Sequence, residues 1–334
     1  MVDAPALSIV FFGTPAFAAP ALEALLESRH RVVAAVCQPD RPSGRGQKPR
    51  AGPVKALAIG AGLPVLQPER LKDPAFLQSL EALGADLGVV AAYGRIIPED
   101  IIHTPRLGLI NVHASLLPRY RGAAPIQRAV MAGERATGVT IMRIVRELDA
   151  GSMFAKLVRP IALDATSGDL ERDLAAAGGL LLVEVVHAIA AGTAREEPQD
   201  DSLATYAPKI TREESAIDWT RSALAIHNQV RGLSPWPRAS TSLAGARIIV
   251  SRTWPEGVAG VANVAGTEVP ALHSGAHSGG QHPGTVVEAA GEAIRVAAGE
   301  GVLSMLELQP EGKRVMTARE FVAGHAVRPG MRFA

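Results

Sequence analysis

The chain has 334 residues, of which 47% are hydrophobic and 20% charged, and its formal net charge at pH 7 is +1. This is globular composition at a length beyond the usual limit of one hydrophobic core, so we expect two domains. A net charge near zero excludes nucleic-acid binding through a global basic field and leaves only local basic patches. The single cysteine, Cys37, excludes an internal disulfide and fits a reducing compartment.

The chain opens with a strand-turn-helix-strand pattern. An apolar run at 8–12 ends in Gly-Thr-Pro, which predicts a helix with Thr14 as its N-cap and Pro15 as its first residue. A second apolar run follows at 32–37. This unit is typical of a parallel sheet with crossover helices. It lacks the G-x-G-x-x-G fingerprint, so a dinucleotide cofactor is not indicated.

The same alternation continues through the N-terminal half and predicts an α/β domain over residues 1–193. Two of the later strands are separated by a turn and could pair with each other. The expected strands lie at 64–66, 87–92, 108–112, 138–144 and 152–160. The expected helices lie at 54–61, 74–83, 125–132 and 167–190.

A polar segment at 194–209 is predicted to be a linker, and residues 210–334 a second, smaller domain. Its short β-like segments at modest spacing favour a small barrel. These segments lie at 246–251, 284–288, 293–297 and 303–308, with helices at 220–230 and 317–323. A Gly-, Ala-, Ser- and His-rich stretch at 258–282 is interpreted as a surface loop, because no cysteine or paired carboxylate accompanies its histidines to form a metal site.

The segment LGLINVHASLLPRYRGAAPI, at 107–126, is the most informative in the chain. Asn111 and His113 stand two residues apart at the end of an apolar run, so a strand would place them on one face with Val112 turned into the core. An amide donor beside an imidazole suits acyl or formyl transfer, because the amide can hold an oxyanion and the imidazole can move a proton. The alternative is that both satisfy backbone groups where the strand leaves the sheet.

A third candidate, Asp149, lies in ELDAGSM at 147–153. A carboxylate beside His113 would fix the orientation of the imidazole and favour its charged form. Asp-Ala-Gly is also a turn sequence, so Asp149 could simply cap its own backbone.

These segments together identify a resemblance. The chain is similar to the formyltetrahydrofolate-dependent transformylases, and within them to the members that act on methionyl-tRNA. The Asn-x-His pair with a later Asp is shared by the whole family, whereas the basic insertion and the C-terminal domain with its PWP resemble the tRNA-directed members. The matching segments are FFGTPAFAAPALEALL, QPDRPSGRGQK, AAYGRIIP, INVHASLLPRYRGAAPIQRA, GVTIMRI with LDAGSM, and RGLSPWPRA.

The resemblance implies a Rossmann-like, mostly parallel sheet domain followed by a C-terminal β-barrel of oligonucleotide-binding (OB-like) type. It implies 10-formyltetrahydrofolate as co-substrate, the α-amino group of methionyl-initiator tRNA as acceptor, and no metal. Asn111 and His113 would hold the oxygen of a tetrahedral intermediate, while Asp149 orients His113. We further expect a cytoplasmic monomer without a leader, and no apolar stretch long enough to span a membrane.

The resemblance also implies substrate contacts. Folate would be bound by residues of the SLLP turn and of the segment after the fourth strand: Ser115, Leu116, Leu117, Pro118, Tyr93, Gly94 and Ile96. A basic loop at 38–48 would engage the tRNA acceptor end through Arg41, Arg45 and Lys48. Basic residues near the C-terminus either follow the tRNA backbone or are scattered surface charge. They are Lys313, Arg314, Arg319, Arg328 and Arg332.

Two other kinds of protein fit parts of this pattern. Another transformylase, acting on glycinamide ribonucleotide or an amino sugar, or a formyltetrahydrofolate hydrolase, would share Asn-x-His and Asp. The basic insertion and the barrel-like second domain argue against the nucleotide enzyme. A non-catalytic RNA-binding module would leave Asn111 and His113 without a purpose.

Because Arg45 sits among Pro and Gly in the basic loop, we expect Arg45→Ala to weaken catalysis on tRNA more than the binding of folate. Steady-state kinetics with each substrate varied in turn would measure this. Equal losses for the two substrates would reject the assignment.

Overall fold

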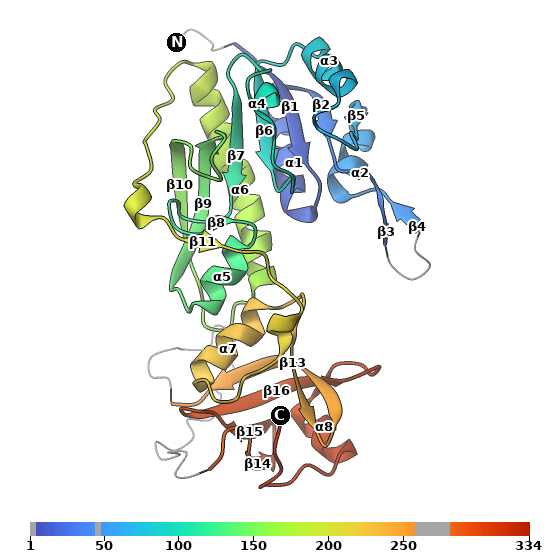
Figure 1. Cartoon of the computed structure of the whole chain (residues 1–334), viewed down its shortest axis with the longest axis vertical. Coiled ribbons are helices and arrows are strands. Elements are labelled where there is room, and N and C mark those ends of the chain that lie inside the picture. Colours follow the sequence, from blue (N-terminus) through green and yellow to red (C-terminus); the bar gives the residue numbers. More distant parts are fainter. Residues whose placement is uncertain (1–4, 44–47, 258–280) are drawn as a thin grey trace. The chain divides into compact units, whose positions relative to one another are not determined.

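The computed structural model describes residues 5–43, 48–257 and 281–334, with the backbone alone for 41–43 and 48–50. It divides into two compact units (Figure 1). The first comprises Met1–Pro125, Ala136–Arg159 and Glu171–Pro208. The second comprises Ile126–Arg135, Pro160–Leu170 and Lys209–Ala334.

The division differs from the expected one at the segment predicted to be a linker. Residues 194–208 belong to the first unit, because the short strand β11 (Tyr206–Ala207) pairs in parallel with β8 (Arg121–Gly122). Neither short strand was predicted, since two residues carry no periodicity.

The first unit is built on a seven-stranded sheet in the order β10-β9-β7-β6-β1-β2-β5. The five strands β7, β6, β1, β2 and β5 are parallel, and β9 runs antiparallel to β7. This confirms the predicted Rossmann-like sheet, including the pairing of β9 with β10. The strands are β1 Ser8–Gly13, β2 Arg31–Val36, β5 Val65–Leu66, β6 Leu87–Ala91, β7 Leu109–His113, β9 Ala136–Arg143 and β10 Met153–Pro160.

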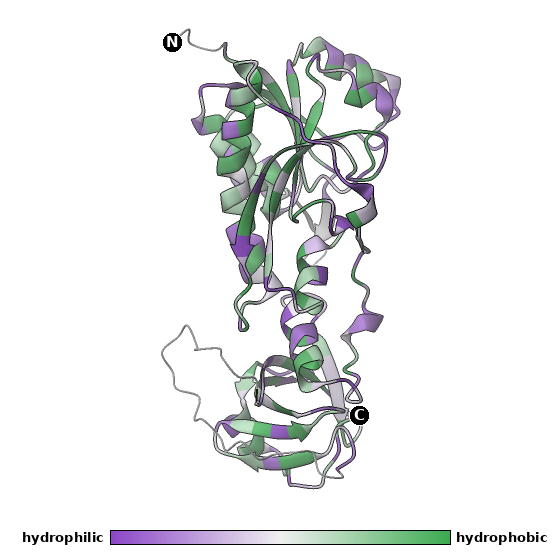
Figure 2. Cartoon of the chain, turned by 90° about the vertical axis from the view of Figure 1, so that its left-hand side faces the viewer, coloured by the Kyte–Doolittle hydropathy of each residue, from purple (hydrophilic) through white to green (hydrophobic). Residues whose placement is uncertain are grey.

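The strand order reverses between β1 and β6, so the connections after these two strands leave in opposite directions, as at the switch point of other doubly wound sheets. Both strands are buried almost throughout, as expected for parallel strands covered on two faces. Figure 2 shows the strands of this sheet mostly in the hydrophobic colour. Ligands of such sheets bind at the carboxyl ends of the strands near the switch point, which is the edge where β1, β6 and the adjacent β7 end.

The helices follow the predicted pattern except at the first turn and at the short α4, which was not predicted. The Thr14 side chain does not cap a helix, because its Oγ1 accepts a hydrogen bond from the Gln38 backbone N–H at 3.1 Å. A 3-10 turn, η1 (Ala16–Ala18), precedes α1, and Pro15 is its N-cap. The helices are α1 Ala19–Glu27, α2 Pro53–Gly60, α3 Pro74–Ala82, α4 Glu99–Ile102, α5 Pro125–Met131 and α6 Ser167–Ala190, with a further 3-10 turn η2 at Asp201–Leu203.

Helix α6 corrects the expectation that no segment could cross a membrane. By length and composition it passes that test, with 44% of its most apolar window buried within the structure. Gly178 lets it approach the sheet, since a Cβ there would meet a Val112 methyl at 3.0 Å. At Gly179 a Cβ would lie 2.7 Å from the Pro20 carbonyl oxygen of α1. The two glycines therefore allow close packing, which is the behaviour of a core helix.

The second unit contains an antiparallel sheet in the order β12-β13-β16-β15-β14, and β17 adds to β16. Backbone bridges from the C-terminal residues, Leu243 to Phe333 and Thr285 to Arg332, join the two ends of this order. The sheet thereby closes, which confirms the predicted barrel. Its elements are α7 Ala223–Gly232, β12 Ala239–Leu243, β13 Ala246–Pro255, β14 Val286–Ala290, β15 Ala293–Ala297, β16 Val302–Pro310, β17 Met316–Thr317 and α8 Ala318–Gly324, with η3 at Glu213–Ser215.

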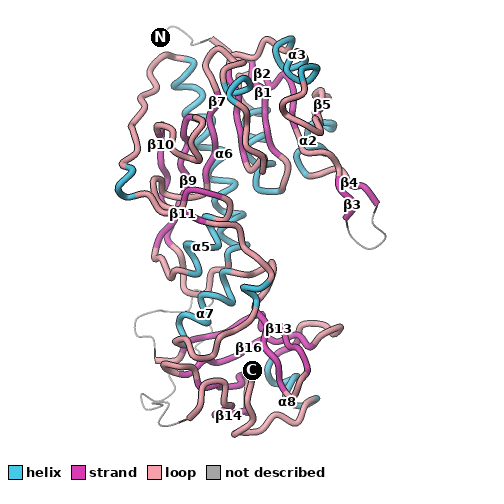
Figure 3. Tube along the Cα trace, in the orientation of Figure 1, coloured by secondary structure: helices cyan, strands magenta, loops and turns pink. Residues whose placement is uncertain are grey.

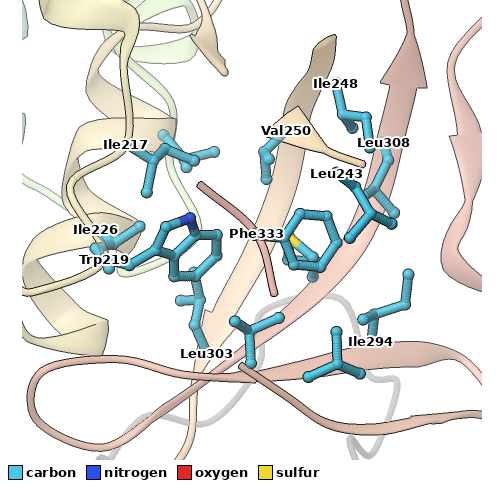
Figure 4. Packing of buried hydrophobic residues seen from close by; sticks show 14 of the residues in the cluster. Ile217, Trp219, Ile226, Leu243, Ile248, Val250, Ile294, Leu303, Leu308 and Phe333 are labelled. Atoms are coloured by element: carbon cyan, nitrogen blue, oxygen red, sulfur yellow. The ribbon is translucent and has the colours of Figure 1, made fainter. Parts of the chain in front are cut away.

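The barrel core is aliphatic around one aromatic pair (Figure 4). Trp219 and Phe333 lie with ring centroids 5.9 Å apart, and Trp219 Nε1 donates to Thr241 Oγ1 at 3.0 Å. Trp236 of the PWP motif does not belong to this core, because its side chain is half exposed. All three tryptophans of the chain, Trp219, Trp236 and Trp254, belong to the second unit, and Trp219 is the one in the buried cluster.

Gly179→Ala should destabilise the chain, although alanine is the better helix former. The added methyl would meet the Pro20 backbone at 2.7 Å, and overpacking of this kind costs about 1–3 kcal/mol. Gly60→Ala in α2 is the matched control, because no atom lies within 4 Å of its Cβ position. Urea denaturation should show a loss for Gly179→Ala and none for Gly60→Ala. Equal stability of the two variants would contradict the close packing of α6.

Candidate active site

Asn111 and His113 lie at the carboxyl end of β7, between β6 and β9. Asn111 stands opposite Val90 and Met142 in the register, and His113 opposite Thr140. Their spacing puts both side chains on one face of the sheet, while Val112 between them is 3% exposed and packs near α6 on the other. Asn111 is partly exposed and His113 is buried, so the amide is the more accessible group.

The ring nitrogens of His113 face two different partners. Nε2 lies 3.0 Å from the Tyr120 carbonyl oxygen, and Nδ1 lies 3.7 Å from Asp149 Oδ2. A carbonyl oxygen can only accept, so Nε2 must carry a proton and donate it. In the neutral ring Nδ1 then holds a lone pair. A proton arriving at Nδ1 would face the carboxylate, so the pair can hold one proton between them.

Asp149 reaches His113 from the turn between β9 and β10. The structure thus brings together the three residues expected to form the site. Asp149 Oδ2 also accepts a hydrogen bond from the Gly122 backbone N–H at 2.8 Å. That donor fixes the carboxylate from the side opposite the turn. Only glycine fits at 122, because φ is 124° and a Cβ would lie 2.8 Å from the Ala207 carbonyl oxygen.

Two residues beside His113 have left-handed backbones. Tyr120, whose carbonyl accepts from His113, has φ 61°, and Asp149 has φ 48°. Such conformations are uncommon for residues other than glycine, especially for an aromatic one, and need support from their surroundings. They aim the Tyr120 carbonyl and the Asp149 carboxylate at the same imidazole.

The side chains of the SLLP turn divide into buried and accessible ones. Ser115 is fully buried, and its Oγ donates to the Arg119 carbonyl at 2.7 Å. Leu117 is buried beside Met142 and Met153. Leu116 and Pro118 are partly exposed. Of the four predicted folate residues, Leu116 and Pro118 can therefore offer side chains to a ligand, while Ser115 and Leu117 shape the turn.

The predicted folate segment after β6 divides in the same way. Tyr93 points into the core, edge-on to Phe12 at 5.6 Å, and burial raises the pKa of its phenol to about 12. Gly94 is exposed with φ 76°, and Ile96 is 87% exposed. Ile96 borders an open depression of about 440 Å³ whose other lining residues are Glu69, Arg70, Leu71, Lys72, Arg95 and Pro98. Gly94 and Ile96 thus remain available to a ligand, and the Tyr93 ring does not.

The basic loop is a two-stranded ribbon, β3 (Arg41–Ser43) with β4 (Lys48–Arg50), extending away from the sheet (Figure 3). Its register pairs Arg41 with Arg50 and Ser43 with Lys48. Arg45 lies outside the described residues, as do the side chains of Arg41 and Lys48.

The base of this ribbon is firmly anchored. Lys55 Nζ donates to Asp40 Oδ2 at 2.6 Å and to Gln67 Oε1 at 2.7 Å. Hydrogen bonds from Lys55 and Gln67 hold the pKa of Asp40 below its usual value. Gln67 also donates to the Gln38 carbonyl, and Gln38 Nε2 donates to the Tyr93 carbonyl at 2.6 Å. Gln38 therefore joins the ribbon to the end of β6.

Several residues around His113 were not predicted. Tyr120 and Gly122 act through backbone atoms, which leave no signal beyond the turn-forming Arg-Gly pair. Gln199 and Thr205 lie in the expected linker, where nothing in the sequence distinguishes them. Their contacts could be found only from the fold.

Comparison with known proteins assigns the family. The family model described as "Formyl transferase" matches residues 7–186, and "Formyl transferase, C-terminal domain" matches residues 209–326. The chain belongs to the formyl transferase family. A protein named "Methionyl-tRNA formyltransferase" from Pseudomonas paraeruginosa is 45% identical to this formyl transferase, covering 96% of this chain and 99% of its own. One of the same name from Methylococcus capsulatus is 46% identical, covering 96% and 98%.

Solved structures show that the fold of this formyl transferase is shared more widely. WlaRD, a sugar 3N-formyl transferase, superposes with TM-score 0.64 at 17% identity, covering 93% of this chain and 100% of its own. HypX from Aquifex aeolicus, solved in complex with tetrahydrofolic acid, superposes with TM-score 0.60 at 17% identity, covering 95% and 47%. At these identities the likeness concerns the fold alone.

A different buried histidine, His30, supports the fold of this formyl transferase outside the site. Its Nδ1 accepts a hydrogen bond from the Leu7 backbone N–H at 3.1 Å, and its ring lies 4.9 Å from that of His187. Burial, with smaller contributions from His187 and Arg29, lowers the pKa of His30 from 6.5 to about 4. The folded chain therefore keeps His30 neutral where an unfolded chain would protonate it.

From this we expect stability to fall as pH drops from about 6.5 towards 4, because the unfolded chain then binds a proton that the folded chain refuses. His30→Asn keeps an acceptor for the Leu7 N–H but does not titrate, so its urea midpoint should depend less on pH over this range. An unchanged pH dependence in the variant would show that His30 is not responsible.

Proposed function

We propose that this chain transfers the formyl group of 10-formyltetrahydrofolate to the α-amino group of methionyl-initiator tRNA. The observation that carries the proposal is the near-full-length identity of 43–46% with proteins named methionyl-tRNA formyltransferase. The arrangement of Asn111, His113 and Asp149 supports it, because each group can perform a step of formyl transfer.

Asn111 is the group best suited to hold negative charge. When the amine attacks the formyl carbon, the carbonyl oxygen becomes an oxyanion, and a fixed amide N–H can stabilise it. Asn111 is partly exposed at the strand end, so a substrate oxygen can approach its Nδ2. In the next step the carbon–nitrogen bond to the folate breaks and the formyl group remains on the methionyl nitrogen.

The geometry changes the role that the sequence suggested for His113. Because its Nε2 proton is already donated to the Tyr120 carbonyl, His113 is less suited to serve as a second oxyanion donor. Its Nδ1, facing Asp149, can take a proton released by the attacking amine and return it to the departing folate nitrogen. Asp149 stabilises the imidazolium that exists between these two transfers.

We assign folate binding to the accessible surface formed by the SLLP turn and the segment after β6. Leu116, Pro118, Gly94 and Ile96 supply apolar and backbone contacts. The depression at Ile96 carries Arg70, Lys72 and Arg95. These cations suit the carboxylates at the glutamate end of a folate, with Glu69 as the one opposing charge.

For the tRNA we assign the acceptor end to the basic ribbon, through Arg41, Arg45 and Lys48, and further backbone contacts to the barrel. In functional terms the first unit, including residues 194–208, carries catalysis, and residues 210–334 assist tRNA binding. The substrates suggest a cytoplasmic enzyme, and we expect it to act as a monomer.

The test is transfer of labelled formyl from 10-formyltetrahydrofolate to methionyl-tRNA by the purified chain. Asn111→Ala should lower kcat by about a hundredfold or more, as for loss of one oxyanion donor. His113→Ala should abolish turnover, whereas His103→Ala, at an exposed histidine of the first unit, should retain it. Failure of the unaltered chain to label methionyl-tRNA would reject the function, and full turnover by His113→Ala would reject the mechanism.

A further inference from the structure

The segment 199–205 makes side-chain hydrogen bonds to both parts of the chain that face His113. It belongs to the polar stretch that composition assigned to a linker, and it packs on the first unit instead. Its contacts converge on the two residues with left-handed backbones, Tyr120 and Asp149. Those two residues supply the groups that face the imidazole.

Gln199 provides the central contact. Its Nε2 donates to the carbonyl oxygens of Asp149 and Gly151, each at 2.8 Å, and so holds the turn that carries the carboxylate. Its Oε1 accepts from Arg121, at 3.1 Å from Nε and 2.8 Å from Nη2. The Gln199 amide thus donates to the turn that carries Asp149 and accepts from Arg121, next to Tyr120.

Arg121 passes this contact on to the carboxylate. Its side chain is 5% exposed and is also paired with Asp201 at 2.6 Å, so the guanidinium is fixed. The next residue, Gly122, donates its backbone N–H to Asp149 Oδ2. Gln199 therefore holds Asp149 in two ways. It binds the backbone carbonyl of Asp149 directly, and it fixes Arg121, whose neighbour Gly122 donates to the Asp149 carboxylate.

Thr205 holds the remaining partner of His113. Its Oγ1 accepts from the Tyr120 backbone N–H at 2.9 Å, and its carbonyl accepts from the Arg121 N–H at 2.8 Å. These bonds stabilise Tyr120 at φ 61° and aim its carbonyl at His113 Nε2. The segment 199–205 thus supports both partners of His113, the Tyr120 carbonyl and the Asp149 carboxylate.

We propose that segment 199–205 positions the His113–Asp149 pair and that Gln199 is its principal positioning residue. The proposal deepens the function above and rests on it. Gln199 does not touch the reacting atoms. It sets the distance between the carboxylate and Nδ1, on which the stabilisation of the imidazolium by Asp149 depends.

Two variants of Gln199 separate its donor from its acceptor. Gln199→Ala removes both, while Gln199→Glu keeps an acceptor for Arg121 and loses both N–H donors to the Asp149 turn. We expect each to lower kcat by about 10- to 100-fold at saturating substrates, because small misplacements of catalytic groups have effects of this size. KM for both substrates should change little, since no substrate contact is removed.

Gln309 of the barrel is a matched control. Its Oε1 accepts from Arg238 at 2.6 Å and its Nε2 donates to the Lys313 carbonyl at 2.7 Å, so it makes the same kinds of bond. Gln309→Ala should leave kcat unchanged. Thermal unfolding of each variant shows how much of any loss comes from instability.

Two readouts distinguish positioning from a purely structural role. The pH–rate profile of the Gln199 variants should shift relative to the unaltered enzyme, and the His113 imidazole signals in histidine NMR should move. A double-mutant cycle should show that the losses from Gln199→Ala and Arg121→Ala are less than additive, since the two side chains share one contact.

The outcomes are separable. If the unaltered chain does not formylate methionyl-tRNA, the proposed function fails. If it does, and the Gln199 variants match it in kcat and pH profile while folding normally, the positioning proposal is wrong. A kcat loss that Gln309→Ala reproduces would also overturn it.

Discussion

The candidate site depends on one constraint, namely that a single imidazole is held between a backbone carbonyl and a carboxylate. The carbonyl of Tyr120 decides which ring nitrogen carries the proton, and Asp149 lies beside the other. Neither group comes from the strand that bears His113. The turn after β7, the turn after β9 and the segment 199–205 must all be in place before the imidazole has a defined protonation pattern.

Much of the fold and the core of the site could be predicted from the sequence. The apolar runs that became β1, β2, β6 and β7 are short, continuous and bounded by turn residues, which is the pattern of buried parallel strands. The i, i+2 spacing placed Asn111 and His113 on one face without knowledge of the neighbours. Asp149 could be named as a candidate, but its position beside His113 could not be predicted, because nothing local to a turn aspartate indicates a partner distant in the chain.

The predictions that failed did so where long-range contacts outweigh local pattern. Thr14 stands where an N-cap is expected from the sequence, but its hydroxyl oxygen accepts a hydrogen bond from the Gln38 backbone N–H instead. Residues 194–208 have the composition of a linker, yet Gln199 and Thr205 make the hydrogen bonds that hold the site. The fold alone does not select the acceptor, because WlaRD, a sugar 3N-formyl transferase of 17% identity, shares it.

The contact of Gln38 with the Tyr93 carbonyl has a consequence for how the two substrates influence each other's binding. The ribbon assigned to tRNA and the strand end assigned to folate share this one anchor, which Gln67 and Lys55 hold in turn. Any displacement of the anchor by one substrate alters the site of the other, and linkage makes that influence mutual and equal in free energy. Through this anchor, binding of either substrate can change the affinity for the other.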